Sequence, residues 1–151
     1  MSLAAAARAA LRADFLEADL GISGANFLAA DTGTLALIEN EGNIRLSTSA
    51  PRVHIALVGI EKVVPRLEDL SGLLQLTSRS ATGQVIGTYV SLVSGPRRGE
   101  DPDGPDSLHV VFVDNGRTRL LFDDVAWHAL RCVRCQSVYE KTHTRPSEPT
   151  L

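Results

Sequence analysis

A nearly continuous apolar run, Val53 to Val58, lies between Pro51 and Gly59 near the middle of the chain. A short strand that is apolar at successive positions has no face for water, so it is typical of a central strand covered on both sides. The 151 residues are 44% hydrophobic, which is enough for one domain with a packed core. The run therefore predicts a layered fold built around a buried sheet.

The remaining patterns alternate between strands and helices. Helices are expected at residues 3–17, 67–76 and 119–132. Strands are expected at residues 27–30, 34–38, 88–93 and 108–113, and residues 45–49 are assigned to a strand or a loop. Turns are expected at residues 31–33, 39–43, 95–106 and 115–116, and the last dozen residues are expected to be disordered. This order predicts an α/β fold with a layered mixed or mostly parallel sheet and flanking helices.

Charge and composition exclude several classes of protein. The net charge is −3 and the basic residues are scattered, so we expect no nucleic-acid partner. Apolar runs fall short of the roughly 18 residues that a membrane span needs, and the Ala-rich start lacks the pattern of a secretory signal. Two closely spaced cysteines make no disulfide framework, so a reducing, cytoplasmic setting is expected.

Two glycine- and hydroxyl-rich segments are candidates for ligand binding. Turns at strand ends expose backbone N–H groups that hold phosphates or carboxylates, and nearby hydroxyls add donors. The alternative is that these segments are ordinary turns. The candidate residues are Gly21, Ser23, Gly24, Thr32, Gly33 and Thr34.

A polar set is the best candidate for the lining of a pocket. It consists of Asn26, Asp31, Arg45, Arg52 and His54. A guanidinium such as that of Arg52 grips a carboxylate with two parallel hydrogen bonds. A histidine inside an apolar run is more often a satisfied core residue than a catalyst, and this is the plainer interpretation of His54. A catalytic role is one interpretation of the neighbouring pair Glu61-Lys62, and a solvated start of a helix is the plainer one.

Cys132 and Cys135 are the candidate metal ligands. A [4Fe–4S] cluster takes about four thiolates, and one chain offers two. A zinc site that adds His128 or His143 is chemically permissible. The third alternative is that the thiols bind no metal.

Several segments together resemble one known family. They include Gly21-Ile-Ser-Gly-Ala-Asn-Phe27, Asp31-Thr-Gly-Thr-Leu35, Pro51-Arg-Val-His-Ile55, Gly59-Ile-Glu-Lys-Val-Val-Pro65, Asp114-Asn-Gly-Arg117 and Ala129-Leu-Arg-Cys-Val-Arg-Cys135. In order and spacing they are similar to the lactate-utilisation protein B family, whose core is the LUD domain, over roughly residues 10–140. The resemblance implies an α/β fold related to sugar-phosphate isomerases and CoA-transferases. It also implies a cytoplasmic subunit, with iron–sulfur clusters, of a system that oxidises L-lactate to pyruvate.

The chain departs from the family pattern in two regions. The family domain begins well upstream of Gly21, so residues 1–125 are expected to form the C-terminal part of a LUD-type domain. A full cluster motif has the form C-x2-C-x2-C-x3-C-P, whereas here Val138 and Thr142 stand at the last two cysteine positions. Residues 126–151 are therefore expected to be a degenerate, partly disordered remnant of a ferredoxin-like region. Asp31 stands where the family more often has Glu.

Three hypotheses follow from these observations. The first is an accessory LUD-type subunit of lactate oxidation that associates with sister subunits and has an incomplete iron–sulfur motif. The second is a stand-alone enzyme that acts on a small carboxylate or a CoA-type ligand. The third is a non-functional gene fragment, with a homodimer covering a bare sheet edge.

Overall fold

The computed structural model describes residues 3–85, 87 and 89–132. The strands are β1 (Leu20–Gly24), β2 (Phe27–Ala29), β3 (Thr34–Glu39), β4 (Val53–Gly59), β5 (Val63–Val64), β6 (Tyr89–Val93) and β7 (Ser107–Val113). The α-helices are α1 (Leu3–Glu17), α2 (Asn43–Ser49), α3 (Leu70–Thr82) and α4 (Arg117–Leu120). Short 3-10 helices are η1 (Ile60–Lys62), η2 (Leu67–Asp69) and η3 (Ala126–Arg131). The predicted α/β class is confirmed.

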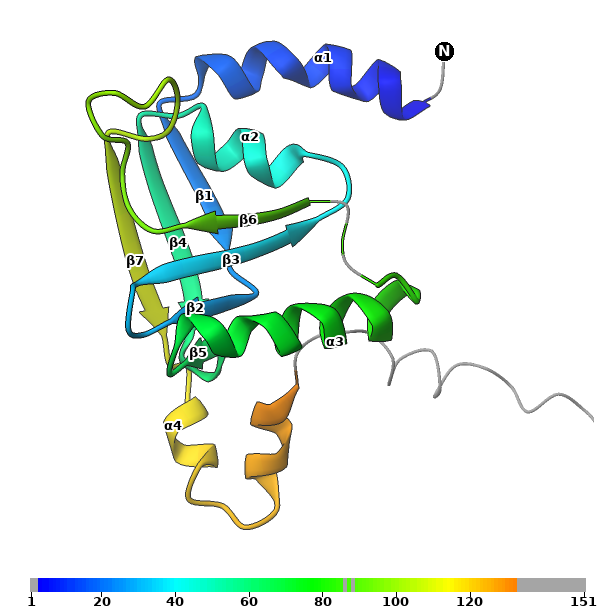
Figure 1. Ribbon diagram of the computed structural model, residues 1–151, viewed down its shortest axis with the longest axis vertical. Helices are drawn as coiled ribbons and strands as arrows, with labels where there is room; N and C mark the ends of the chain where they lie inside the picture. Colours follow the sequence, from blue (N-terminus) through cyan, green and yellow to red (C-terminus); the bar gives the residue numbers. More distant parts are fainter. Residues whose placement is uncertain (1–2, 86, 88, 133–151) are drawn as a thin grey trace, which may run out of the picture.

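The first sheet is parallel and has the order β1-β4-β7. The apolar strand β4 is in its centre, as the run from Val53 to Val58 predicts. In the register, Val53 lies opposite Leu20 of β1 and Ser107 of β7. Because all three strands run the same way, their carboxyl ends meet at one edge of the sheet, beside α4 (Figure 1).

The second sheet is mixed and has the order β5-β2-β3-β6. Its centre is the antiparallel pair β2–β3, in which Ala29 lies opposite Thr34. The hairpin turn predicted at residues 31–33 is confirmed. Gly33 takes a φ of 67°, a conformation that a residue without a Cβ adopts without strain.

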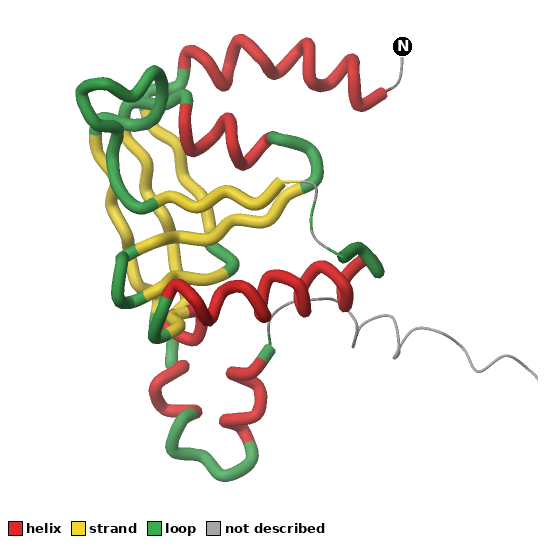
Figure 2. The backbone as a smooth tube through the Cα atoms, viewed as in Figure 1, coloured by secondary structure: helices red, strands yellow, loops and turns green. Residues whose placement is uncertain are grey.

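The two sheets are packed face to face, with their strands crossing steeply (Figure 1). Leu28 and Leu35 of the mixed sheet meet Ala56 and Val58 of the parallel sheet in one buried cluster. Alternate residues of β2 and β3 point the other way, towards α3. There Phe27, Ala29 and Ala36 meet Leu70 in a second cluster, which is separate because the mixed sheet lies between the two. The mixed sheet is thus buried on both faces, as Figure 2 also shows for its position between the parallel strands and α3.

Residues 45–49 correct the expectation of a strand or loop. They belong to α2, because the carboxylate of Glu39 accepts hydrogen bonds from the backbone N–H groups of Ile44 (2.7 Å) and Arg45 (2.9 Å). A buried carboxylate at a helix N-terminus satisfies donors that otherwise lack partners and opposes the positive end of the helix dipole. The helix thus begins because of a residue outside the pattern that was used to predict a strand.

The continuous helix expected at residues 119–132 is also wrong. The chain forms α4, a turn, and then η3, which together make a helical hairpin below the sheets (Figure 2). The Asp123 carboxylate accepts hydrogen bonds from the N–H groups of Val125 (3.0 Å) and Ala126 (2.8 Å). This side chain therefore starts a new helical turn where the sequence favoured uninterrupted helix.

The helix expected at residues 67–76 is present as η2 followed by α3, which continues to Thr82 and is closed by Gly83 with a φ of 72°. Among the described residues, no helix combines the length and apolar character that crossing a membrane would require.

Candidate functional site

The carboxyl edge of the parallel sheet carries three charged groups with little access to water. Strands β1, β4 and β7 end there at Gly24, Gly59 and Val113. Open α/β sheets bind ligands outside the carboxyl ends of their strands, because the chain leaves the sheet there and the loops diverge. Two clefts of about 340 Å³ and about 190 Å³ open at this edge.

Glu61 and Lys62 come from η1, the single turn that follows β4. The carboxylate of Glu61 folds back over the Cα of Gly59, a position that a Cβ at residue 59 would overlap. The Glu61 side chain is 11% exposed, and Lys62 is 7% exposed. The expectation of a solvated start of a helix is therefore wrong for this pair, since both charges are largely withdrawn from water.

Arg117 reaches the same place from the start of α4. Its Nε lies 2.6 Å from Oε2 of Glu61, and the Arg117 side chain is 22% exposed. Its Nη1 also donates a hydrogen bond to the backbone oxygen of Asp114 (3.0 Å), which fixes the guanidinium plane. Oε2 of Glu61 is buried, and the geometry of its contact with Arg117 is that of an ion pair rather than a hydrogen bond.

The turn between β7 and α4 places Arg117. Asn115 and Gly116 both have positive φ, 44° and 82°. The Asp114 carboxylate accepts hydrogen bonds from the backbone N–H and the hydroxyl of Thr118, both at 2.8 Å. These bonds lower the pKa of Asp114, because they favour its charged form. The turn predicted at residues 115–116 is therefore held rigidly at the edge of the cleft.

Cys132 lies against the same edge. Nζ of Lys62 donates a hydrogen bond to the backbone oxygen of Cys132 (2.8 Å), although the cysteine itself is exposed. Within η3, the Trp127 ring stacks on His128 at a centroid distance of 4.2 Å, and the Arg131 guanidinium lies 4.0 Å from the Trp127 ring centroid. The segment that carries Cys132 is thus tied to the sheet by a buried ammonium group.

The Glu61–Arg117 ion pair lies between the two clefts, because both residues line both of them. The smaller cleft reaches the strand ends and is lined by Gly24, Ala25, Leu57, Gly59, Glu61, Lys62, Val113 and Arg117. The larger cleft lies against the helical hairpin and is lined by Glu61, Asn115, Arg117, Leu120, Ala129, Leu130 and Cys132. Sequence patterns did not single out Arg117 or Asn115 as site residues, although the order of strand and Asn-Gly turn was visible.

Ser23 and His54 were predicted as site residues in separate groups, and the structure brings them together. They lie on neighbouring strands, with Ser23 Oγ 2.8 Å from Nε2 of His54. His54 is fully buried, and Nδ1 has no hydrogen-bond partner among the described residues. Burial lowers the pKa of His54, because the charged imidazolium loses its hydration. His54 lines neither of the two clefts at the carboxyl edge, and its full burial agrees with its interpretation as a core histidine.

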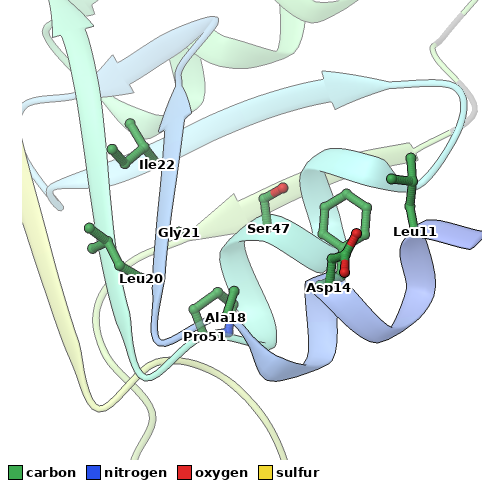
Figure 3. Close-up of a pocket in the computed structure, with 9 residues that line it drawn as sticks. Leu11, Asp14, Ala18, Leu20, Gly21, Ile22, Ser47 and Pro51 are labelled. Atoms are coloured by element: carbon green, nitrogen blue, oxygen red, sulfur yellow. The ribbon is translucent and has the colours of Figure 1, made fainter.

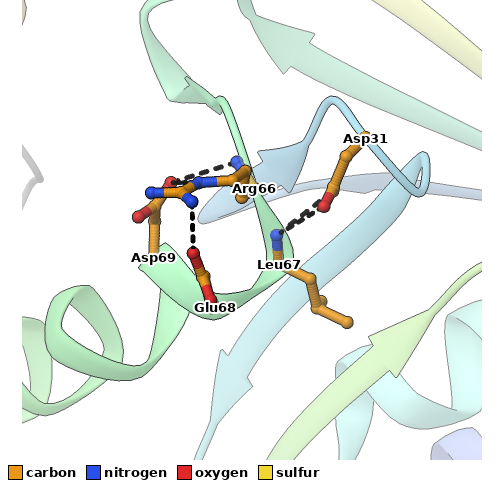
Figure 4. A network of polar contacts seen from close by, with 5 residues as sticks. All are labelled: Asp31, Arg66, Leu67, Glu68 and Asp69. Carbon is orange, nitrogen blue, oxygen red and sulfur yellow. Dashed lines mark hydrogen bonds and ion pairs between the residues drawn. The ribbon is translucent and has the colours of Figure 1, made fainter.

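Asp31, Thr32 and Thr34 lie at the turn of the hairpin β2–β3. Both carboxylate oxygens of Asp31 accept a hydrogen bond from the Leu67 backbone N–H, at 3.1 and 3.2 Å (Figure 4). The hydroxyls of Thr32 and Thr34 are 2.8 Å apart, and Thr34 continues to Ser94 at 2.9 Å. These contacts join neighbouring elements of the mixed sheet and η2.

Asn26, Arg45 and Arg52 have separate surroundings. The Asn26 side-chain oxygen accepts a hydrogen bond from the Ile38 backbone N–H (2.8 Å), inside the mixed sheet. Arg45 is exposed on α2. Arg52 lies 3.1 Å from Asp106, whose other oxygen meets Arg97 at 2.7 Å. The side chains of Asp31, Arg52 and His54 therefore do not converge, so the shared pocket that the stand-alone enzyme hypothesis needs is absent among the described residues.

The segment from Gly21 to Gly24 is not a turn, because it forms strand β1. Gly21 is required by packing, since a Cβ there would overlap the backbone oxygen of Ser47 in α2. Figure 3 shows the groove of about 300 Å³ that Gly21 shares with α1. Its lining is Leu11, Asp14, Phe15, Ala18, Leu20, Gly21, Ile22, Ser47 and Pro51. Ligand binding by the glycines and hydroxyls stays a prediction.

The metal prediction concerns one described residue, Cys132. Cys135 and His143 lie outside the described residues, as do the last dozen residues for which disorder is expected. Within the part of the chain that the structure covers, no three side chains among His, Cys, Asp and Glu gather into a metal-binding group. The described residues therefore do not by themselves fit a four-thiolate cluster.

Comparisons with known proteins agree on one family. The LUD domain model matches residues 2–113. Lactate utilization protein B of Shouchella clausii is 46% identical over 134 residues, which is 87% of this chain and 28% of that protein. Lactate utilization protein B of Bacillus pumilus is 48% identical over 131 residues, or 85% of this chain and 27% of that protein. The chain thus spans less than a third of the length of these relatives.

A solved structure shares the fold. A DUF162 family protein from Deinococcus radiodurans superposes with a TM-score of 0.52 at 24% identity, over 67% of this chain and 57% of that one. This similarity supports the α/β architecture alone, since the sequences have diverged too far to carry residue roles.

Proposed function

Since this chain belongs to the LUD domain family, we propose that it acts in lactate utilisation as an accessory subunit of the system that oxidises L-lactate to pyruvate. The observation that carries the proposal is the match, at nearly half identity, to proteins named lactate utilization protein B over most of the chain. The matched region includes the turn η1 and the end of β7, where Glu61 and the Asp114–Arg117 turn lie. The proposed setting is the cytoplasm, with sister subunits as partners.

Growth on L-lactate tests this role. A strain that lacks the gene for this chain should grow poorly when L-lactate is the carbon source, and normally on glucose. Supplying the 151-residue chain should restore growth on lactate. A strain that grows equally well on lactate without the gene would refute the role, and affinity purification from lactate-grown cells would test the sister subunits as partners.

Iron–sulfur binding by Cys132 and Cys135 is a separate proposal. Two thiolates per chain are half of what a [4Fe–4S] cluster takes, so four thiolates require two molecules. A homodimer that pools its cysteines is one such arrangement. The division of the chain at residues 125 and 126 into a sheet-bearing part and a cysteine-bearing part remains part of this proposal.

Iron and sulfide analysis after anaerobic reconstitution tests the cluster. A shared cluster predicts about two iron atoms per chain and a dimer in sedimentation, because four irons are divided between two molecules. An iron content near zero per chain would refute cluster binding by this chain. Zinc analysis of the same sample would test the alternative ligand set with His128. The variant with Cys132 changed to Ser is the control, since it lowers the thiolate count and leaves the sheets intact.

A further inference from the structure

We propose that strand β1 is the surface through which two copies of this chain associate. In this dimer the two β1 strands pair antiparallel, with a twofold axis at Ile22. The two parallel sheets then form one continuous sheet with the order β7-β4-β1-β1-β4-β7. The inference depends on the geometry of the sheet and goes beyond the proposed role in lactate utilisation, on which it does not rest.

One edge of β1 is open. The strand is outermost in its sheet, and among the described residues it pairs with β4 alone. The backbone oxygen of Asp19, just before the strand, accepts a hydrogen bond from the Val53 N–H group of β4 (3.1 Å). Successive residues of a strand direct their N–H and C=O groups to opposite sides. Residues 21 and 23 therefore face β4, as Asp19 does, whereas residues 20, 22 and 24 face the open edge.

This open edge lacks the features that normally keep strands from pairing. Natural edge strands are protected by charged side chains, a proline or a bulge. The segment from Leu20 to Gly24 contains no charged residue and no proline, and its register with β4 is uninterrupted. Leu20 is 47% exposed and Ile22 is 59% exposed, so apolar side chains accompany the unpaired backbone groups. A strand added at this edge would satisfy both.

The strand is complementary to itself in one antiparallel register. With the axis at Ile22, Leu20 lies opposite Gly24 of the second copy, and Ile22 lies opposite its own counterpart. These residues all face the open edge, and each such pair exchanges two hydrogen bonds, so every outward N–H and C=O group gains a partner. A shift by one residue would place outward groups opposite inward ones and turn the side chains to the wrong face.

The side chains fit the same register. Leu20 lies opposite a glycine, which leaves room for its side chain, and the two Ile22 side chains form a β-branched pair across the strands. On the inner face Gly21 lies opposite Ser23, and both are small enough to preserve the close packing of β1 against α2. A twofold axis brings identical groups together. Because β1 carries no charge, no like charges meet there.

A groove of about 300 Å³ extends the contact beyond the backbone (Figure 3). It lies between β1, which contributes Leu20 and Ile22, and α1, which contributes Leu11 and Phe15. Leu11 is 49% exposed. A strand laid along the open edge of β1 lies at the mouth of this groove and withdraws its apolar lining from water. The groove therefore adds hydrophobic burial to the backbone hydrogen bonds.

The short length of β1 limits the strength of the dimer. Five residues extend about 17 Å. A stable, specific interface buries about 800 Å² on each partner. One short strand pair with a shallow apolar groove falls at the low end of that range. We therefore expect a dissociation constant in the micromolar range.

This dimer does not bring the cysteines together. Because the two β1 strands are antiparallel, the carboxyl edge of one sheet lies next to the amino edge of the other. Cys132 is held at the carboxyl edge of its own sheet by the hydrogen bond from Lys62. The two copies of Cys132 therefore lie at opposite edges of the joined sheet. A cluster that shares thiolates would need a different contact, so the two proposals are tested independently.

Sedimentation velocity of the full chain, from low micromolar to several hundred micromolar, tests the dimer. The unaltered chain should pass from monomer to dimer. Ile22→Lys should raise the dissociation constant at least about tenfold, because it places two like charges at the twofold axis. Val111→Lys is the matched control, since it adds the same charge at an apolar residue that is 45% exposed on β7, the opposite edge of the same sheet. It should dimerise like the unaltered chain.

Cysteine cross-linking tests the register. The starting chain carries Cys132→Ser and Cys135→Ser. In this chain Ile22→Cys should form a disulfide-linked dimer under mild oxidation, because hydrogen-bonded residues opposite each other have Cα atoms about 5.5 Å apart, within reach of a disulfide. Leu20→Cys should stay unlinked, since its counterpart lies roughly 13 Å away along the strand.

Each result supports or overturns the pairing. A chain that stays monomeric at every concentration refutes the dimer, and so does an Ile22→Lys variant that is folded by circular dichroism and dimerises as readily as the unaltered chain. Loss of the dimer in Val111→Lys but not in Ile22→Lys would place the contact elsewhere. If Ile22→Lys does not fold, the cysteine variants decide. Cross-linking of Ile22→Cys alone supports the register, whereas cross-linking of both variants or of neither overturns it.

Discussion

At the scale of single residues, the buried His54 makes the stability of the fold depend on pH. His54 lies on the inner face of β4, with Ser23 bonded to Nε2 and no partner for Nδ1. The tautomer with its proton on Nε2 has the lower free-energy cost of burial. In this tautomer Nδ1 is an acceptor without a donor, which costs less to bury on a neutral ring than an N–H group without an acceptor. Charging this ring would leave a buried cation without a counterion.

We expect acid to destabilise the protein through His54. Burial lowers its pKa in the fold below the ordinary value of 6.5, so the unfolded chain takes up this proton first as the pH falls. The free energy of unfolding should therefore drop below pH 6.5, with a slope of at most about 1.4 kcal/mol per pH unit for one proton. Urea unfolding at pH 7.5, 6.5 and 5.5 measures it.

The control for this prediction is the exposed His109 on β7. His54→Gln should lower stability at pH 7.5 but flatten the dependence between pH 6.5 and 5.5, whereas His109→Gln should keep the slope of the unaltered chain. An identical slope in all three proteins would show that His54 is not the group responsible.

The glycine at position 21 sets the distance between β1 and α2. Gly21→Ala should destabilise the fold by about 2–3 kcal/mol, because the new Cβ overlaps the Ser47 backbone oxygen and forces the helix away. Gly24→Ala is the matched control on the same strand, since the nearest atom to its Cβ would be the Leu57 oxygen at 3.9 Å. Thermal unfolding of both variants measures the difference, and equal melting temperatures would contradict the close approach.

At the scale of elements, the sequence predicted what depends on local periodicity. The apolar run of β4, the hairpin at residues 31–33 and the helix after Pro65 are all present, because each is determined by side chains within the element. The predictions for residues 45–49 and 119–132 were wrong, because the carboxylates of Glu39 and Asp123 determine where the helices in these segments begin. The periodicity of apolar residues does not reveal a side chain that caps the backbone, whether it lies outside the segment, as Glu39 does, or within it, as Asp123 does.

The candidate site was missed for a similar reason. Glu61 and Lys62 follow β4 in an arrangement typical of a solvated loop, and their burial depends on α4 and η3, which lie more than fifty residues later. The predicted polar set lies between residues 26 and 54, and its members contact separate partners. Asn26 and Asp31 accept hydrogen bonds from backbone N–H groups, whereas Arg52 pairs with Asp106 and His54 meets Ser23. Which residues from distant segments come together depends on the topology of the fold, and the order of the strands along the chain does not determine that topology.

Asp31 provides a prediction at this scale, because it joins the β2–β3 hairpin to the helix that covers it. Asp31→Ala should cost about 1 kcal/mol, the usual value for a lost helix N-terminal cap, since the Leu67 N–H loses both acceptor oxygens. Asp31→Asn keeps one oxygen and should cost less. Chemical denaturation of both variants tests the order, and Asn costing as much as Ala would show that charge rather than the hydrogen bond matters.

At the scale of the whole molecule, the parallel sheet is covered on one face only among the described residues. Its inner face meets the mixed sheet through Ala56 and Val58. The other face carries Ile22 and Leu57 on β1 and β4, which are 59% and 44% exposed, and Val111 on β7. Parallel sheets are normally buried on both sides, and apolar patches on a surface tend to bind other apolar groups.

Leu57 and Val58 allow this asymmetry to be measured, because they are neighbours that point to opposite faces. Leu57→Thr should change the free energy of unfolding by less than about 0.5 kcal/mol and reduce the binding of the dye ANS, since it removes apolar surface from the exposed face. Val58→Thr buries a hydroxyl between the sheets, where Val58 is 0% exposed, and should cost about 1–3 kcal/mol with dye binding by the folded protein unchanged. Urea unfolding and dye fluorescence on the same samples separate the two effects. If both variants lost the same stability, both faces of the parallel sheet would have to be buried in solution, and a covering partner, including a second copy of the chain, would then have to account for it.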